Sequence, residues 1–166
     1  MKKRIAYLGD LEEVAQAIKS CDGVERVFWI AGNQDNEALE ADRRVGNVRE
    51  LEQALKELGP FDLGVIANFG IILSKECLSI PKEGFINAHM GLLPQYPGRL
   101  PIRSALEKGE SVVGVTLHRV TEKVDEGPII QTKLLAAGQS RDAHEIFDRM
   151  TRLIPDMIIE FLLSFC

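Results

Sequence analysis

The stretch Phe85-Ile-Asn-Ala-His-Met-Gly-Leu-Leu-Pro-Gln-Tyr-Pro-Gly-Arg-Leu-Pro101 joins a short apolar strand, predicted over 84–88, to a loop that is rich in proline. Two polar residues, Asn87 and His89, stand two positions apart where this strand ends. Residues i and i+2 of a strand point to the same face of a sheet, so the two side chains are expected to project together. Ligand sites of open α/β sheets lie at the carboxyl ends of the strands, and the position therefore predicts a functional site.

The chain before this stretch alternates predicted strands with predicted helices. In order, the apolar patterns predict strand 5–8, helix 11–18, strand 24–30, helix 48–58, strand 62–67, a short helix 75–78 and strand 84–88. Asn47 and Glu50 form the pattern of a capping box, and Ser74 is expected to cap the short helix. The polar stretch 31–44 predicts a loop with a helical turn. Strands that alternate with helices indicate a parallel sheet.

The second half of the chain breaks this alternation. A helix is predicted from Pro101, and two strands, 112–120 and 128–134, then follow with only a short polar connection between them. Short connections join antiparallel neighbours, so the sheet is expected to be mixed. The last segment, 143–162, carries an apolar stripe at helical spacing, and Pro155 within it predicts a kink or a division into two helices. The stripe predicts a core-facing helix or the interface of a homodimer.

Length and composition predict one domain over residues 1–166. The chain is 45% hydrophobic and 27% charged, which is typical of a globular protein, and its net charge of −5 gives no footprint for nucleic acid or an anionic membrane. No segment approaches the ~20 apolar residues that span a bilayer. Cys21, Cys77 and Cys166 are widely spaced and form no CxxC pair. We therefore expect neither disulfides nor a metal site, and a cytoplasmic location.

Four polar residues are expected to lie near one another in this arrangement: Asn87, His89, His118 and Asp125. An asparagine amide and an imidazole can both donate hydrogen bonds to an oxyanion, and an imidazole can accept a proton from an amine. A carboxylate beside a histidine fixes its tautomer. These groups suit acyl transfer to an amine through a tetrahedral intermediate. No serine or cysteine with a local base is evident, so direct attack by the amine is expected.

The motifs in this region resemble those of the folate-dependent formyltransferases, which include the methionyl-tRNA, glycinamide ribonucleotide and sugar N-formyltransferases. Their signature is Asn-x-His, a Leu-Leu-Pro-x-Tyr-x-Gly-x-x-Pro loop, a Gly-x-Thr-x-His strand and an Asp-x-Gly turn. The matching segments here are Asn87-Ala-His89, Leu92-Leu-Pro-Gln-Tyr-Pro-Gly98 with Pro101, Gly114-Val-Thr-Leu-His118 and Asp125-Glu-Gly127. The resemblance is densest over 62–131. It implies an α/β, Rossmann-like fold of three layers, with a mixed, mostly parallel sheet whose antiparallel strands lie in the C-terminal half.

The resemblance also implies roles for individual residues. Asn87 would hold the formyl oxygen, His89 would stabilise the oxyanion and help to move the proton, and Asp125 would set the state of His89 and organise a water. The implied formyl donor is 10-formyltetrahydrofolate, and an apolar pocket suits its flat pterin ring. The residues implied to line that pocket are Phe69, Gly70, Ile71, Ile72, Leu73, Val120 and Val124.

The acceptor is predicted by elimination. No Gly-Ser-Asn-like phosphate loop follows Gly9, which disfavours glycinamide ribonucleotide. The chain is acidic, and the C-terminal domain that tRNA formyltransferases carry is not expected here. Both features disfavour tRNA as the acceptor. A primary amine on a small molecule, such as a nucleotide-linked amino sugar, is therefore expected. The alternative is a catalytically weak folate- or nucleotide-binding module of the same fold.

Several positions depart from the family pattern or have no assigned role. Pro97 stands where the commoner loop has arginine, and Asn68-Phe-Gly70 stands where relatives often have Ala-Tyr-Gly. His118 lies within a strand, and a structural or supporting role is expected for it. His144 is expected to be solvated.

Overall fold

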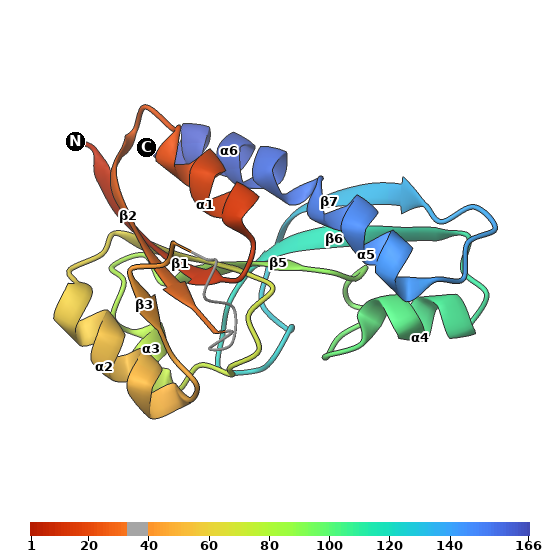
Figure 1. The fold of residues 1–166 in the computed structure, drawn as a ribbon, viewed down its shortest axis with the longest axis horizontal. Helices are drawn as coiled ribbons and strands as arrows, with labels where there is room; N and C mark the ends of the chain where they lie inside the picture. The colour runs from red at the N-terminus through yellow and green to blue at the C-terminus, as the bar shows by residue number, and fades with distance from the viewer. Residues whose placement is uncertain (33–39) are drawn as a thin grey trace.

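A seven-stranded sheet forms the centre of the protein (Figure 1). The computed structural model describes residues 1–32 and 40–166. The strands are β1 (Lys3–Gly9), β2 (Val24–Ala31), β3 (Arg43–Arg44), β4 (Leu63–Ala67), β5 (Phe85–His89), β6 (Val112–Arg119) and β7 (Ile129–Ala136). The helices are α1 (Glu12–Lys19), α2 (Val48–Leu58), α3 (Lys75–Leu78), α4 (Pro101–Glu107), α5 (Ala143–Thr151) and α6 (Ile154–Phe165).

The predicted alternation of strands and helices is confirmed, with one difference. β3 lies in the stretch 31–44, for which a loop with a helical turn was expected, and it pairs in parallel with the end of β2. Residues 33–39 of that stretch lie outside the described residues. The short strand adds an edge to the sheet but contributes little apolar burial.

The sheet order is β3-β2-β1-β4-β5-β6-β7, and neighbours from β3 to β5 are parallel. β6 runs antiparallel to β5 and to β7, which confirms the predicted mixed sheet. Antiparallel pairing places Asn87 opposite His118 and His89 opposite Thr116. The reversal of β6 therefore brings the second half of the chain to the carboxyl end of β5.

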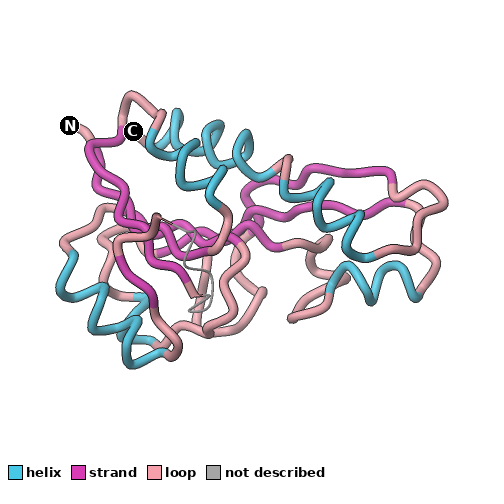
Figure 2. The backbone as a smooth tube through the Cα atoms, in the orientation of Figure 1, coloured by secondary structure: helices cyan, strands magenta, loops and turns pink. Residues whose placement is uncertain are grey.

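Two apolar cores cover the two faces of the sheet, which gives three layers (Figure 1). One core lies between the sheet and α1, α4, α5 and α6, and the other lies between the sheet and α2 and α3. β4 is buried along its whole length, as its continuous apolar sequence predicts for a strand covered on both faces. In Figure 2 the antiparallel strands extend away from the end of the molecule that carries both termini.

Local signals fix the ends of the helices. Asn47 Oδ1 accepts from the Glu50 N–H at 3.0 Å, as a capping box requires. The Glu50 carboxylate accepts in return from the Asn47 side-chain amide at 2.7 Å and from the Gly46 N–H at 2.7 Å. Pro155 lies in the first turn of α6, and the expected division of the last helix is confirmed. Among the described residues, no helix is both long enough and apolar enough to cross a bilayer.

Candidate active site

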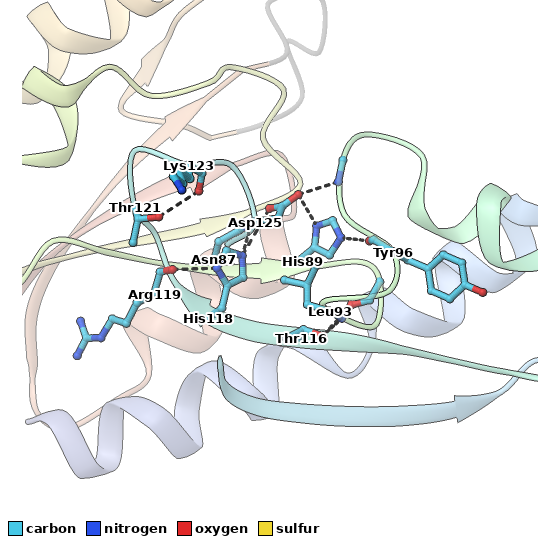
Figure 3. A network of polar contacts seen from close by, with 12 residues as sticks. Asn87, His89, Leu93, Tyr96, Thr116, His118, Arg119, Thr121, Lys123 and Asp125 are labelled. Atoms are coloured by element: carbon cyan, nitrogen blue, oxygen red, sulfur yellow. Dashed lines mark hydrogen bonds and ion pairs between the residues drawn. The ribbon is translucent and has the colours of Figure 1, made fainter. Parts of the chain in front are cut away.

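Asn87 and His89 lie together at the carboxyl end of β5, on the face of the sheet that carries α2 and α3 (Figure 3). β6 supplies His118 beside them, and the connection between β6 and β7 supplies Asp125. The side chains of both histidines and of Asp125 are at least nine-tenths buried. The structure thus brings together the four polar residues that the sequence pattern singles out.

Asn87 is oriented by His118. The Asn87 Nδ2 atom lies 3.2 Å from His118 Nε2, and His118 Nδ1 lies 2.9 Å from the carbonyl oxygen of Arg119. A carbonyl oxygen can only accept, so Nδ1 carries the proton and Nε2 accepts from the Asn87 amide. Burial lowers the pKa of His118 below its ordinary value, which favours this neutral form. The remaining amide N–H of Asn87 is then available to a ligand.

His89 is held in a defined state by the backbone of the following loop. His89 Nε2 lies 2.7 Å from the carbonyl oxygen of Tyr96 and must donate to it. His89 Nδ1 lies 3.6 Å from Asp125 Oδ2, while Asp125 Oδ1 lies 3.6 Å from His118 Nε2. One carboxylate therefore faces both imidazoles, and Nδ1 is the His89 nitrogen left for chemistry.

The proline-rich loop holds this arrangement from outside. Its Gly98 N–H donates to Asp125 Oδ2 at 2.8 Å, and the Tyr96 hydroxyl donates to Glu110 Oε1 at 2.5 Å. The Thr116 hydroxyl donates to the Gly91 carbonyl at 2.7 Å and accepts from the Leu93 N–H at 3.1 Å. Both ends of the loop are thus fixed to neighbouring elements. Sequence reasoning missed these roles because Tyr96 and Gly98 contact the site through backbone groups, which leave no side-chain signature.

Two non-glycine residues within 1–32 and 40–166 adopt the left-handed backbone region, and both line the same pocket. They are Asn68, with φ of 52°, and Asp125, with φ of 55°. Asparagine and aspartate tolerate this region better than other L-residues do. Strained backbone of this kind concentrates at functional sites, where the surrounding structure enforces it.

A pocket of about 600 Å³ opens beside the four polar residues. Its wall includes all seven residues implied for the pterin ring: Phe69, Gly70, Ile71, Ile72, Leu73, Val120 and Val124. Ile72 and Val124 are 67% and 53% exposed, so the pocket presents apolar surface to solvent. His144 is exposed, as expected, but it also lies on the pocket wall together with Arg99 and Arg103.

The fold and the site define a class of α/β protein in which an amide, two imidazoles and a carboxylate meet at the end of a central strand, beside an apolar pocket. The family model described as "Formyl transferase" matches residues 15–162. The chain belongs to the formyl transferase family.

Sequence relatives agree with this assignment. The chain is 40% identical over 120 residues to a methionyl-tRNA formyltransferase of Thermotoga neapolitana, covering 70% of this chain and 37% of the relative. It is 38% identical over 113 residues to the corresponding protein of Ehrlichia ruminantium, covering 68% of this chain and 37% of the relative. The aligned part thus spans little more than a third of these relatives.

Solved structures share the fold over nearly the full length of the chain. A glycinamide ribonucleotide transformylase from Symbiobacterium toebii matches with a TM-score of 0.82 and 24% identity, covering 96% of this chain and 85% of that one. A phosphoribosylglycinamide formyltransferase from Streptococcus pneumoniae matches with a TM-score of 0.80 and 23% identity, covering 99% of both chains. At this identity the likeness shows the fold, and the expected Rossmann-like formyltransferase fold is confirmed.

Proposed function

We propose that this protein transfers a formyl group from 10-formyltetrahydrofolate to a primary amine. The observation that carries the proposal is the cluster of Asn87, His89 and Asp125 at the end of β5, with one Asn87 amide N–H and one His89 nitrogen directed to ligand chemistry. Family membership supports the reaction class.

The pocket fits the donor. Its apolar wall suits a flat heteroaromatic ring, and it adjoins the polar cluster without an intervening element. When bound, the donor supplies an activated formyl group on a nitrogen atom. The exposed side chains of Ile72 and Val124 would be covered by the ring. This burial contributes roughly 25 cal/mol per Å² of apolar surface removed from water.

The proposed roles follow from the hydrogen bonds of the free site. The Asn87 amide, held by neutral His118, donates its second N–H to the formyl oxygen. His89 Nδ1 would accept the proton of the attacking amine as the new N–C bond forms, and the same proton would pass to the donor nitrogen as the bond from that nitrogen to the formyl carbon breaks. Asp125 stabilises the protonated imidazole across 3.6 Å. The His89 Nε2–H donates to the carbonyl oxygen of Tyr96, so a ring flip that exchanged Nε2 and Nδ1 would break this hydrogen bond.

For the acceptor we propose a small primary amine, with a nucleotide-linked amino sugar as the leading case. The net charge of −5 supports this choice because it disfavours a polyanionic macromolecule. Methionyl-tRNA is the second candidate, and the 40% identity to a methionyl-tRNA formyltransferase favours it.

The test is a transfer assay with 10-formyltetrahydrofolate and a panel of methionyl-tRNA, glycinamide ribonucleotide and nucleotide-linked amino sugars. Mass spectrometry detects a formylated product, and His89→Gln serves as the inactive control. A product with any member of the panel supports formyl transfer and identifies the acceptor. Binding of the stable analogue 5-formyltetrahydrofolate without any product supports the catalytically weak binding module. Absence of both would contradict the proposal.

A further inference from the structure

Arg99 lies on the wall of the pocket, at the end of the proline-rich loop. It directly follows Gly98, whose N–H donates to Asp125 Oδ2 at 2.8 Å. The backbone at Arg99 is therefore fixed to a residue of the candidate active site. The side chain is exposed, so its guanidinium is accessible to a ligand that enters the pocket.

The other charged groups on the pocket wall have partners, whereas Arg99 forms no ion pair with any carboxylate in the described chain. Arg103, one helical turn further on, pairs with Glu107 at 3.1 Å. Glu122 pairs with Lys75 at 3.3 Å, and Asp125 faces the two histidines. The charge of Arg99 is thus unmatched on a wall where acidic groups are already engaged.

A guanidinium group in this position has a defined chemical preference. Its planar fork matches the two oxygens of a carboxylate or phosphate, and such charge-assisted pairs are about twice as strong as neutral hydrogen bonds. Arg103 on the same wall adds positive charge, although Glu107 partly neutralises it.

We propose that Arg99 forms an anion subsite of the pocket, which binds a carboxylate or phosphate group of a reactant while the reacting group lies at Asn87 and His89. The inference rests on the proposed function, because it assigns a recognition role within the same site. Two sources share this chemistry: the glutamate carboxylates of the folate donor, and a phosphate group of the acceptor.

Equilibrium titrations of the full chain separate these sources. The probes are 5-formyltetrahydrofolate, the neutral 5-formyltetrahydropteroyl amide, which has the same ring system but neither glutamate nor a free carboxylate, and inorganic pyrophosphate. Each is titrated calorimetrically into the wild type, Arg99→Gln, Arg103→Gln and Arg152→Gln. Arg152 is exposed and lies off the pocket wall, so its variant is the matched control for loss of one positive charge.

The expected result is about a tenfold loss of affinity in Arg99→Gln for the probe that carries the relevant anion. Arg103→Gln is expected to have a smaller effect, and Arg152→Gln none. Weaker binding of 5-formyltetrahydrofolate with unchanged binding of the neutral pteroyl amide assigns the subsite to the donor. Weaker binding of pyrophosphate alone assigns it to the acceptor.

Unchanged affinity of Arg99→Gln for all three probes would overturn the subsite even if folate binds well. Equal weakening of both folate compounds, with pyrophosphate unaffected, would also overturn it, because the effect would not depend on an anion. If the wild type binds neither folate compound, the proposed function fails separately. The pyrophosphate titration then decides the subsite: binding that is lost in Arg99→Gln supports it, and no binding to the wild type overturns it.

Discussion

The two halves of the sheet differ in what they bury. β1, β2 and β4, here called the parallel half together with α1, bury only apolar and aromatic side chains. β5 and its antiparallel neighbour β6, which with the β6–β7 connection are called the antiparallel half, also bury apolar residues but add His89, Thr116 and His118. Thr151 on α5 is the only other polar residue buried in the described part of the chain. Polar burial is costly unless hydrogen bonds compensate it, and each of these three β-strand residues has hydrogen-bond partners. The difference fits the proposed function, in which the residues of the antiparallel half carry the chemistry while the parallel half chiefly stabilises the fold.

Strand direction explains why the site lies where it does. A parallel neighbour of β5 would have needed a crossover, and its carboxyl end would have lain beside the carboxyl end of β5. The antiparallel β6 instead passes the end of β5 in mid-course, so that His118 lies opposite Asn87. The connection from β6 back to β7 is short, and it places Asp125 beside His89 and His118. Substitutions in the two halves should therefore have separable effects.

The largest effect is expected from His89→Gln in the antiparallel half. The substitution removes the proposed proton acceptor, and the rate of formyl transfer should fall by about 10²–10⁴-fold. Steady-state assays with the acceptor that the transfer panel identifies measure this loss. The melting temperature should stay close to that of the wild type, and a large decrease would show that the residue is chiefly structural.

Ile18→Ala in the parallel half should have the opposite profile. Ile18 on α1 is fully buried, and truncation of such a side chain lowers the free energy of unfolding by about 2–5 kcal/mol. Chemical denaturation measures the change, with Ile18→Val as the milder control. The transfer rate of the folded fraction should be unchanged. A proportionate loss of rate would mean that the two halves are coupled.

Asp125→Asn tests the carboxylate while it preserves the shape of the side chain. Loss of the negative charge that faces His89 should reduce transfer by roughly 10²-fold, since stabilisation of a charged imidazole is lost. The amide oxygen can still accept from the Gly98 N–H, so the loop should keep its position. Asp125→Ala removes both the charge that faces His89 and the acceptor of the Gly98 N–H, so its transfer rate should fall further than that of Asp125→Asn. Equal effects of the two variants would assign Asp125 a role in loop structure.

His118→Gln should change the pH dependence of stability. Because burial lowers the pKa of His118, the unfolded chain binds a proton below pH 6.5 that the folded chain does not. The contribution of His118 to stability is therefore present above its unfolded pKa and is lost as the pH falls below 6.5 toward the folded pKa. Denaturation at a series of pH values should show a flatter acid limb in the variant. An unchanged limb would contradict neutral burial of this imidazole.

Tyr96→Phe should have the smallest effect. It removes the hydroxyl that donates to Glu110 but keeps the ring and the backbone carbonyl that accepts from His89. The free energy of unfolding should fall by about 1 kcal/mol, the net worth of an ordinary hydrogen bond. Nitrogen NMR of the imidazole rings reports whether His89 keeps its proton on Nε2. A shift to the other tautomer would show that the Glu110 contact is needed to hold the carbonyl in place.

Sequence reasoning recovered most of the fold because its signals are local. Continuous apolar runs predicted β1 and β4, Ser74 predicted the start of α3, and Pro155 predicted the boundary between α5 and α6. β3 was missed because two residues at a sheet edge carry no periodic pattern.

The sequence predicted which side chains form the candidate site, but it did not predict their hydrogen bonds or relative positions. The linked sequence motifs predicted that Asn87, His89 and Asp125 belong to one site. The catalytic roles of these three residues remain predictions. The tautomer of His89 could not be predicted, because it depends on the carbonyl of Tyr96 and hence on the path of a loop. The position of His144 on the pocket wall depends on how α5 packs, which is likewise a long-range property.

The left-handed backbone at Asn68 and Asp125 has a consequence for efforts to stabilise the protein. Glycine at Asn68 would relieve the conformational penalty there, but it would also enlarge the freedom of the unfolded chain and loosen the loop that carries the apolar wall. At Asp125 the same change would remove the carboxylate itself. Stabilising substitutions are therefore better placed in the part of the parallel half that lies off the pocket wall, such as α1, where added rigidity does not compete with ligand entry.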